Sequence, residues 1–156
     1  MFRKMRRKKQ ELTEKQCLDI LRRAKTATLA LSGDDGYPYS VPMNFVYEDG
    51  KIYFHGAKEG HKIDAIRNNP KVSMSIIDQE DVIEEELTTY FRSVILFGKA
   101  RILQEDDEIY HAIETLGLKY NEDEVTVEKE IQREWKALCC IEITIEHISG
   151  KQAIEL

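Results

Sequence analysis

The order of hydrophobic and polar residues along the chain separates helical segments from extended ones. Thr13 and Gln16 form a capping-box pattern, and Cys17, Leu18 and Leu21 then recur at helical spacing on one face. The pattern predicts four helices, over residues 13–25, 59–69, 106–120 and 127–137. Apolar runs of period two predict six strands, over residues 26–31, 37–47, 51–55, 72–77, 90–103 and 138–148.

The connections between these elements indicate how the strands pair. Turn residues at 32–36 and 48–50 join the first three strands at hairpin length. Pro38 and Pro42 cannot donate to a β-ladder, so the second strand is expected to be bulged or to lie at a sheet edge. The acidic run 78–86 is predicted to be a solvated excursion. Early hairpins and a late return strand predict a mainly β, α+β fold, a six-stranded antiparallel barrel, closed or split, with helices at its ends.

The composition is that of one globular domain. Hydrophobic residues make up 42% of the 156 residues and charged residues 33%. No apolar run approaches the ~18 residues that span a bilayer, and the N-terminus lacks the apolar stretch of a secretory signal. The three cysteines are odd in number and poorly spaced for disulfides. We therefore expect a cytoplasmic protein with a basic arm at 1–12, a barrel domain at 13–150 and a tail at 151–156.

The N-terminal arm is strongly basic, whereas the rest of the chain is acidic. Six of the 23 Lys and Arg residues lie among the first ten residues, and none of the 29 Asp and Glu residues does. Such an arm can bind nucleic acid or anionic lipid. The acidic body would repel a phosphate backbone, however, and Phe2 is the only aromatic residue of the arm. We favour an arm that packs on an acidic surface of its own dimer over one that binds nucleic acid.

The sequence FHGAKEGHK at 54–62 is the strongest candidate for a binding site. It leads from the end of a strand through a turn of small residues into a helix. The first N–H groups of that helix are unpaired and lie at the positive end of the helix dipole. Gly56 and Gly60 let the backbone approach an anion closely, and Lys62, with His61 when protonated, adds positive charge. The pattern is typical of a phosphate site, although an ordinary surface turn has the same features.

The second strand adds a candidate site for a flat ring system. Such a ring needs an apolar face and a few donors in its plane. In the stretch YSVPMNF at 39–45, Val41 and Met43 can supply the apolar contact and Asn44 a donor, while Pro42 interrupts the ladder. A bulged edge strand without a ligand remains the alternative.

Taken together, these segments resemble a known family. The stretch DGYPYSVPMNFVYEDGKIYFHGAKEGHKIDAIRNNPKV, followed by YFRSVILFGKARIL, is similar to the pyridoxamine 5′-phosphate oxidase-like FMN-binding superfamily. Within it, the chain looks most like the nitroimidazole-resistance (Nim-type) flavoproteins, and the likeness runs from about Met5 to Gly150. The resemblance implies a split β-barrel that forms a homodimer, with FMN bound in two clefts between the subunits.

The resemblance also implies which residues hold the cofactor. The phosphate and ribityl chain are expected near His55, Gly56, Ala57, Gly60, His61 and Lys62. The edge of the isoalloxazine is expected along Val41, Pro42, Met43 and Asn44. The stretch Arg92, Ser93 and Val94 completes the site, and in this superfamily it often reaches across from the partner subunit.

Two departures from the family pattern modify these expectations. His61 stands where relatives commonly have arginine. An imidazole of ordinary pKa, ~6.5, is mostly neutral at pH 7, so FMN binding is expected to be weaker or to depend on pH. The chain also lacks the arginine-rich C-terminal signature of the true pyridoxamine phosphate oxidases, so oxidation of pyridoxamine phosphate is not expected.

Several single residues are candidates for chemistry or for a substrate pocket. His55 can donate to a flavin oxygen or relay a proton, with a structural hydrogen bond as the alternative. Tyr90 and Trp135 can line a substrate pocket, although large aromatic residues more often serve packing. His111 and His147 have no partners at ligand spacing, so no metal site is expected.

The sequence thus predicts an FMN-dependent oxidoreductase. Reduced flavin would pass electrons from a small-molecule donor to a small electrophile such as a nitroaromatic compound, and the cofactor would supply the redox chemistry. A non-catalytic flavin-binding or sensing module is the alternative from a different class. Haem or a deazaflavin in place of FMN is a further alternative that the resemblance to the superfamily leaves open.

Overall fold

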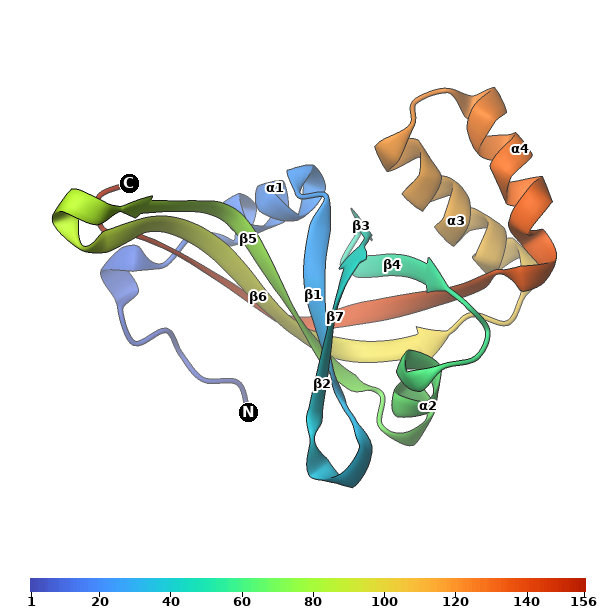
Figure 1. Cartoon of the computed structure of the whole chain (residues 1–156), viewed down its shortest axis with the longest axis horizontal. Helices are drawn as coiled ribbons and strands as arrows, with labels where there is room; N and C mark the ends of the chain where they lie inside the picture. Colours follow the sequence, from blue (N-terminus) through green and yellow to red (C-terminus); the bar gives the residue numbers. More distant parts are fainter.

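The computed structural model describes residues 1–156 and contains one sheet and four α-helices (Figure 1). The helices are α1 (Glu14–Arg23), α2 (His61–Asn68), α3 (Asp106–Tyr120) and α4 (Glu124–Glu134). The strands are β1 (Thr26–Ser32), β2 (Pro38–Asn44), β3 (Val46–Glu48), β4 (Lys51–Gly56), β5 (Lys71–Ile83), β6 (Thr88–Ile102) and β7 (Cys139–Gln152). The expected capping box is present, because Thr13 accepts from the Gln16 N–H and the Gln16 side chain accepts from the Thr13 N–H. No helix is long and apolar enough to cross a membrane.

The sheet is a split antiparallel barrel of seven strands rather than six. Its order is β2-β1-β5-β6-β7-β4-β3, so β2 and β3 form the two edges. The single strand expected over residues 37–47 is divided at Phe45, because β2 pairs with β1 while β3 pairs with β4. One residue separates these opposite edges, and the sheet must therefore curl until they meet. Both prolines of this region lie in edge strand β2, where a missing donor is tolerated.

The corner at Phe45 is fixed by the end of α3. The Phe45 side chain is fully buried, and its N–H donates to the Tyr120 hydroxyl over 3.1 Å. The Phe45 carbonyl accepts from Lys119 Nζ at 2.9 Å, and the same ammonium donates to the Ala24 carbonyl and lies 4.0 Å from the Phe45 ring centroid. Burial lowers the pKa of Lys119 to about 8. The turn that splits the barrel is thus held from outside by two consecutive residues of α3.

The acidic run expected to be a solvated excursion is instead part of a long β-hairpin. Strand β5 continues to Ile83, β6 begins at Thr88, and the two strands pair along their whole length (Figure 1, left). Asp78 anchors the base of this hairpin, because it accepts from Arg23 at 2.7 and 2.8 Å and from Arg92 at 3.2 Å. Hydrogen bonds from these two guanidiniums lower the pKa of Asp78. The prediction failed because pairing between strands overrode the polar composition.

Two clusters of buried residues form the core. The larger one fills the barrel beneath α1 and α2, and it includes Phe45, Phe54 and Leu29. The smaller one lies under the helical hairpin formed by α3 and α4, and it includes Leu116 and Ile131. The second cluster places a helical layer beside strands β3, β4 and β7, outside the barrel proper (Figure 1).

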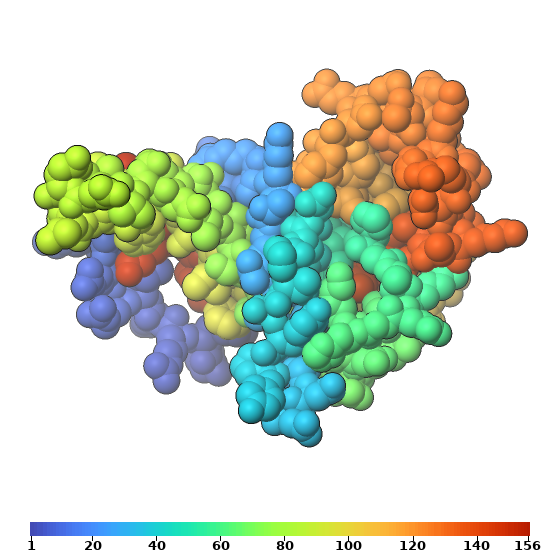
Figure 2. All heavy atoms as spheres, in the orientation of Figure 1, coloured from blue at the N-terminus to red at the C-terminus, as the bar shows by residue number.

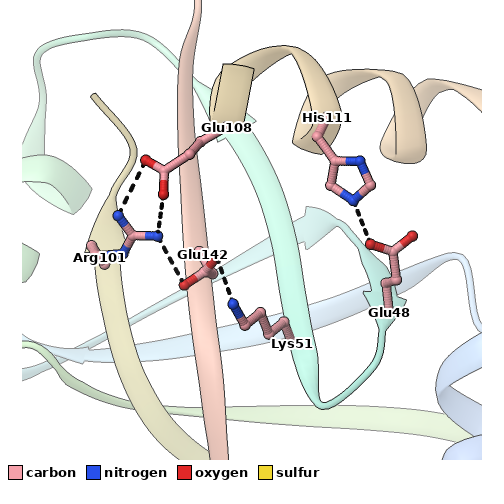
Figure 3. A network of polar contacts seen from close by, with 6 residues as sticks. All are labelled: Glu48, Lys51, Arg101, Glu108, His111 and Glu142. Atoms are coloured by element: carbon pink, nitrogen blue, oxygen red, sulfur yellow. Dashed lines mark hydrogen bonds and ion pairs between the residues drawn. The ribbon is translucent and has the colours of Figure 1, made fainter. Parts of the chain in front are cut away.

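A polar network fastens α3 to these strands (Figure 3). Glu142, a buried residue of β7, accepts from Arg101 at 3.3 Å and from Lys51 at 3.4 Å. Arg101 also donates to Glu108 on α3 at 2.9 and 3.3 Å. Because the buried carboxylate has partners on both sides, its desolvation is compensated, and the network ties β4, β6 and β7 to one helix.

The ends of the chain lie along the strands. Phe2 stacks on Phe97 of β6 and on His147 of β7, with ring centroids 5.2 and 4.9 Å apart. The N-terminal arm is therefore placed against aromatic residues of its own chain. Strand β7 runs to Gln152, so the first two residues of the expected tail belong to the sheet.

The hydroxyl of Tyr120 is expected to stabilise the barrel corner. The Tyr120→Phe variant leaves the buried Phe45 N–H without its partner, which costs about 1–3 kcal/mol. Urea unfolding measures this loss. Tyr37→Phe is the matched control, because Tyr37 is 75% exposed, and it should change stability by less than about 0.5 kcal/mol. Equal stability of the two variants would contradict the role of the hydroxyl.

Candidate functional site

The turn between β4 and α2 has the backbone geometry of an anion site. Gly60 precedes the helix with φ +139°, a conformation essentially restricted to glycine. The first helical bond runs from the Asp64 N–H to the Gly60 carbonyl over 3.1 Å. The N–H groups of residues 61–63 therefore lie outside the helical ladder, at the positive end of the helix.

Lys62 supplies the fixed positive charge at this turn. Its Nζ lies 3.7 Å from the position that a Cβ would take on Gly56, so the ammonium folds back over the glycine. Ala57 and Gly60 are exposed, and Gly56 and Lys62 are half-buried. The small residues leave the backbone open beside a cation, which is the arrangement expected from the sequence.

His61 is oriented away from Lys62. Its ring stacks on Tyr39 of β2, with centroids 4.0 Å apart, and its Nε2 lies 3.9 Å from Asp34. Its Nε2 also lies 3.5 Å from the position that a Cβ would take on Gly33, in the turn between β1 and β2. The His61 side chain thus packs between α2 and the β1–β2 turn. Lys62 is therefore the cation that lies beside Gly56.

A cavity of about 450 Å³ brings the two predicted segments together. Its lining includes Asn44, at the end of β2, and His55, near the end of β4. Both side chains expose part of their surface at the rim. Burial and the positive charge of Lys62 lower the pKa of His55 below 6.5, against a smaller opposing effect of Glu134. At neutral pH the imidazole is therefore uncharged, with one nitrogen able to donate and the other to accept.

Edge strand β2 presents alternate faces to the core and to solvent. Val41 and Met43 are half-buried and pack against the barrel core, whereas Pro42 and Asn44 are exposed. The outer edge of β2 has no neighbouring strand in the sheet, so its unpaired backbone groups face outward. The strand can therefore offer backbone donors and acceptors to a ring lying along it.

The remaining predicted site residues lie in other parts of the chain. Arg92 donates to Gln152 at 3.0 Å and pairs with Asp78, and Ser93 is half-buried in the same strand. Val94 is fully buried in the barrel core. These residues belong to the long hairpin and do not line the cavity at Asn44 and His55.

Tyr90 and Trp135, the two candidates for a substrate pocket, also lie outside this cavity. The Tyr90 hydroxyl donates to Glu86 at 2.6 Å, on the hairpin. Trp135 is half-buried and packs against the smaller core cluster, with its ring 6.4 Å from that of Tyr110. The structure contains no group of three or more His, Cys, Asp or Glu residues that could hold a metal ion.

Most of the cavity wall comes from residues that the sequence did not single out. These residues lie on α3, on α4 and at the approach to β7, and they include Leu116, Gly117, Val127, Ile131 and Leu138. Helical periodicity identifies such positions as buried, but it cannot distinguish a packed face from one that borders a cavity. Gly117 is the one local signal, because a Cβ there would lie 2.8 Å from Val127 Cγ1 and separate the two helices.

A family model described as pyridoxamine 5′-phosphate oxidase matches residues 13–152, which is most of the chain. The chain belongs to this family. The match includes the edge strand β2, the turn before α2 and the long hairpin, and the family assignment agrees with the likeness noted in the sequence.

Similar proteins extend this assignment. A crystal structure from Bacteroides thetaiotaomicron, provisionally named a 5-nitroimidazole antibiotic resistance protein, superposes with TM-score 0.74 at 21% identity, covering 90% of this chain and 85% of that one. The FAD and haem binding protein of Mycobacterium smegmatis gives TM-score 0.76 at 20% identity, covering 94% and 74%. An uncharacterised protein of Rhizobium meliloti is 28% identical over 100 residues, which are 64% of this chain and 61% of that protein. At these identities the structural matches support the fold alone, which is a split barrel.

The pKa of His55 provides a test of the electrostatics at the cavity rim. Titration of its imidazole by NMR is expected to give a pKa below 6.5, and Lys62→Gln should raise it by removing a positive charge. Because the folded pKa is depressed, the contribution of His55 to stability is complete above the unfolded pKa of ~6.5 and is lost as the pH falls from that value through the lower folded pKa. Lys58→Gln, on the same turn, is the control and should leave the His55 pKa unchanged. A pKa at or above 6.5 in the wild type would rule out this environment.

Proposed function

We propose that this protein is a flavin-dependent oxidoreductase that binds FMN, with the phosphate at the turn 56–62. One observation carries the proposal. The Lys62 ammonium lies over Gly56, in the turn that leads to the unpaired first N–H groups of α2. Membership of the pyridoxamine 5′-phosphate oxidase family and the FAD named for the Mycobacterium smegmatis protein support a flavin as the cofactor.

The residues present fit such a cofactor. A phosphate needs donors and positive charge, and the turn has both, with Gly56 and Gly60 leaving room for its oxygens. A flat ring needs an apolar surface and in-plane partners. The exposed ring of Pro42 can supply the first, and the unpaired edge of β2 and Asn44 can supply the second. The proposal therefore assigns Lys62 to the phosphate and β2 with Asn44 to the ring.

When bound, the flavin would supply the capacity to accept and pass on electrons. The protein's own groups would bind and orient. Lys62 compensates the charge of the phosphate, and Asn44 can hold a polar atom of the ring in its plane. Neutral His55 can donate a hydrogen bond to a polar atom beside it or hold a proton there, so it is the candidate catalytic residue.

A small electrophile such as a nitroaromatic compound is the proposed electron acceptor. The similarity to the Bacteroides thetaiotaomicron protein supports this substrate class. A non-catalytic flavin-binding module is the second candidate, because the cavity lining contains no Lys or Arg to bind the phosphates of a nicotinamide donor. Anaerobic reduction by NADH or NADPH, followed by stopped-flow mixing with a nitroimidazole, separates the two. Failure to reduce the flavin or to oxidise it again favours the module.

A homodimer is proposed to complete the flavin site. Ile77, Ile95 and Phe97 lie on one face of the β5–β6 pair and expose 60%, 45% and 39% of their surface. Burying such a face against a second copy is favourable. Within one chain, Arg92 and Ser93 do not line the cavity at His55. The proposed dimer would bring these two residues of one subunit toward the turn 56–62 of the other.

Removal of the Lys62 ammonium is expected to weaken FMN binding. Lys62→Ala should cost about 1–3 kcal/mol, the magnitude of a charge-assisted hydrogen bond. Titration followed by flavin fluorescence measures this, and Lys58→Ala is the control from the same turn, with unchanged affinity. Equal dissociation constants for wild type and Lys62→Ala would refute the phosphate assignment. The same titration with FAD tests whether the larger flavin named for the structural neighbours binds more tightly.

The proposed dimer interface at Ile77, Ile95 and Phe97 can be tested separately from cofactor binding. Ile95→Glu introduces a charge between the paired residues Ser75 and Ser149, and it should convert the dimer to a monomer in light scattering. Ile154→Glu is the matched control, because Ile154 is 74% exposed and lies outside β7, so that variant should remain dimeric. A dimeric Ile95→Glu protein would place the interface elsewhere.

A further inference from the structure

The cavity at His55 continues well beyond the residues assigned to the flavin. Its volume of about 450 Å³ falls within the range of small-molecule sites, roughly 300–1,000 Å³. The far wall is apolar and comes from both helices of the α3–α4 hairpin, with Leu116 from α3 and Ile131 from α4 in its lining. Figure 2 shows this hairpin, in orange, rising beside the strands from β2 to β4.

The cavity is kept open by the way the hairpin is attached. At the end of α3, Tyr120 and Lys119 bond to the Phe45 corner, and near its start Glu108 bonds to Arg101. The helix is thus fixed at both ends to the sheet. Between these anchors Gly117 lets α4 approach α3 closely. The wall is therefore built from rigid elements rather than from a loop.

The charges around the cavity select the kind of molecule that fits. Its lining carries two carboxylates, Glu130 and Glu134, and no Lys or Arg. Glu134 is close enough to raise the pKa of His55, although burial and Lys62 outweigh it. Arg133 pairs with both carboxylates but does not line the cavity. A phosphate, sulfonate or carboxylate placed here would therefore lose its hydration against an apolar wall that offers no cation, at a cost in free energy. The lining thus favours molecules without negative charge.

We propose that this cavity is a second binding pocket, separate from the flavin cleft, for a small uncharged or cationic ring compound. The ring lies against the cavity walls formed by α3 and α4, and its polar end faces His55. The proposal depends on the proposed function in one respect only, that the polar end of the ring compound lies next to the flavin. The pocket then excludes anionic substrates, pyridoxamine 5′-phosphate included, by charge rather than by size.

A pair of matched dyes tests the pocket without any turnover. N-phenyl-1-naphthylamine is uncharged, and 8-anilinonaphthalene-1-sulfonate has the same rings with an added sulfonate. Fluorescence titration of the wild type is expected to show one site per chain for the uncharged dye and at least tenfold weaker binding of the sulfonate. Equal affinity of the two dyes, or no binding of the uncharged one, would overturn the proposal.

Substitutions on α4 locate the dye. Thr126 lines the cavity and its hydroxyl bonds to Asp123, so Thr126→Trp should narrow the opening and weaken dye binding at least tenfold. Val125→Trp is the matched control, because Val125 is the adjacent residue, 61% exposed and outside the lining. Circular dichroism confirms that both variants are folded. Equal dye affinity of the two variants would place the dye elsewhere.

Charge reversal on the same helix tests the selectivity. The double variant Glu130→Lys and Glu134→Lys should bind the sulfonate dye at least tenfold more tightly than the wild type does. Glu124→Lys is the control, because Glu124 lies on α4 outside the cavity. If the double variant still discriminates against the sulfonate, the carboxylates do not set the preference and the charge argument fails.

Competition between the dye and FMN tests whether the pocket is separate from the flavin site. The dye and FMN are expected to bind together, and Lys62→Ala should weaken FMN while leaving the dye affinity unchanged. Competitive displacement of the dye by FMN would show that the cavity belongs to the flavin ring and overturn the proposal. If FMN does not bind and the dye does, the proposed function fails while the pocket stands.

Discussion

One connection constrains the whole barrel, the passage of the chain from β2 to β3 through Phe45. These strands form opposite edges of a seven-stranded sheet, yet a single residue joins them, so the sheet has to curl until its edges lie close together. The buried backbone of Phe45 cannot pair with a strand, and its N–H and carbonyl are satisfied by Tyr120 and Lys119. Because those two residues end α3, the same contacts fix the corner of the split barrel and dock the α3–α4 hairpin.

The candidate site depends on the same closure. Asn44 ends β2 and His55 lies near the end of β4, and only the curl of the sheet brings them to one cavity. The turn that follows His55 leads directly into α2, and the stack of His61 on Tyr39 places this proposed phosphate site next to edge strand β2. The polar network around Glu142 then holds α3 over β4 and β7 (Figure 3), which forms the opposite wall of the cavity.

Short-range sequence patterns predicted the structural features that depend only on residues close together in the chain. The helix at Thr13, the glycine turn before α2 and the edge position of the strand with Pro38 and Pro42 all follow from short-range rules. The division at Phe45 and the long hairpin through residues 78–86 did not, because both arise from pairing between distant strands. The stacking of His61 on Tyr39 and the cavity wall on α4 likewise depend on tertiary packing, which a pattern of residue types does not contain.

In the proposed function, the turn 56–62 binds the phosphate of FMN. FMN and riboflavin share the ring and the ribityl chain and differ only in that group, so their affinities isolate its contribution. Titration of the protein with each should show riboflavin binding at least tenfold more weakly, which corresponds to about 1.4 kcal/mol or more at the turn. Equal affinities for FMN and riboflavin would show that the turn does not bind the phosphate.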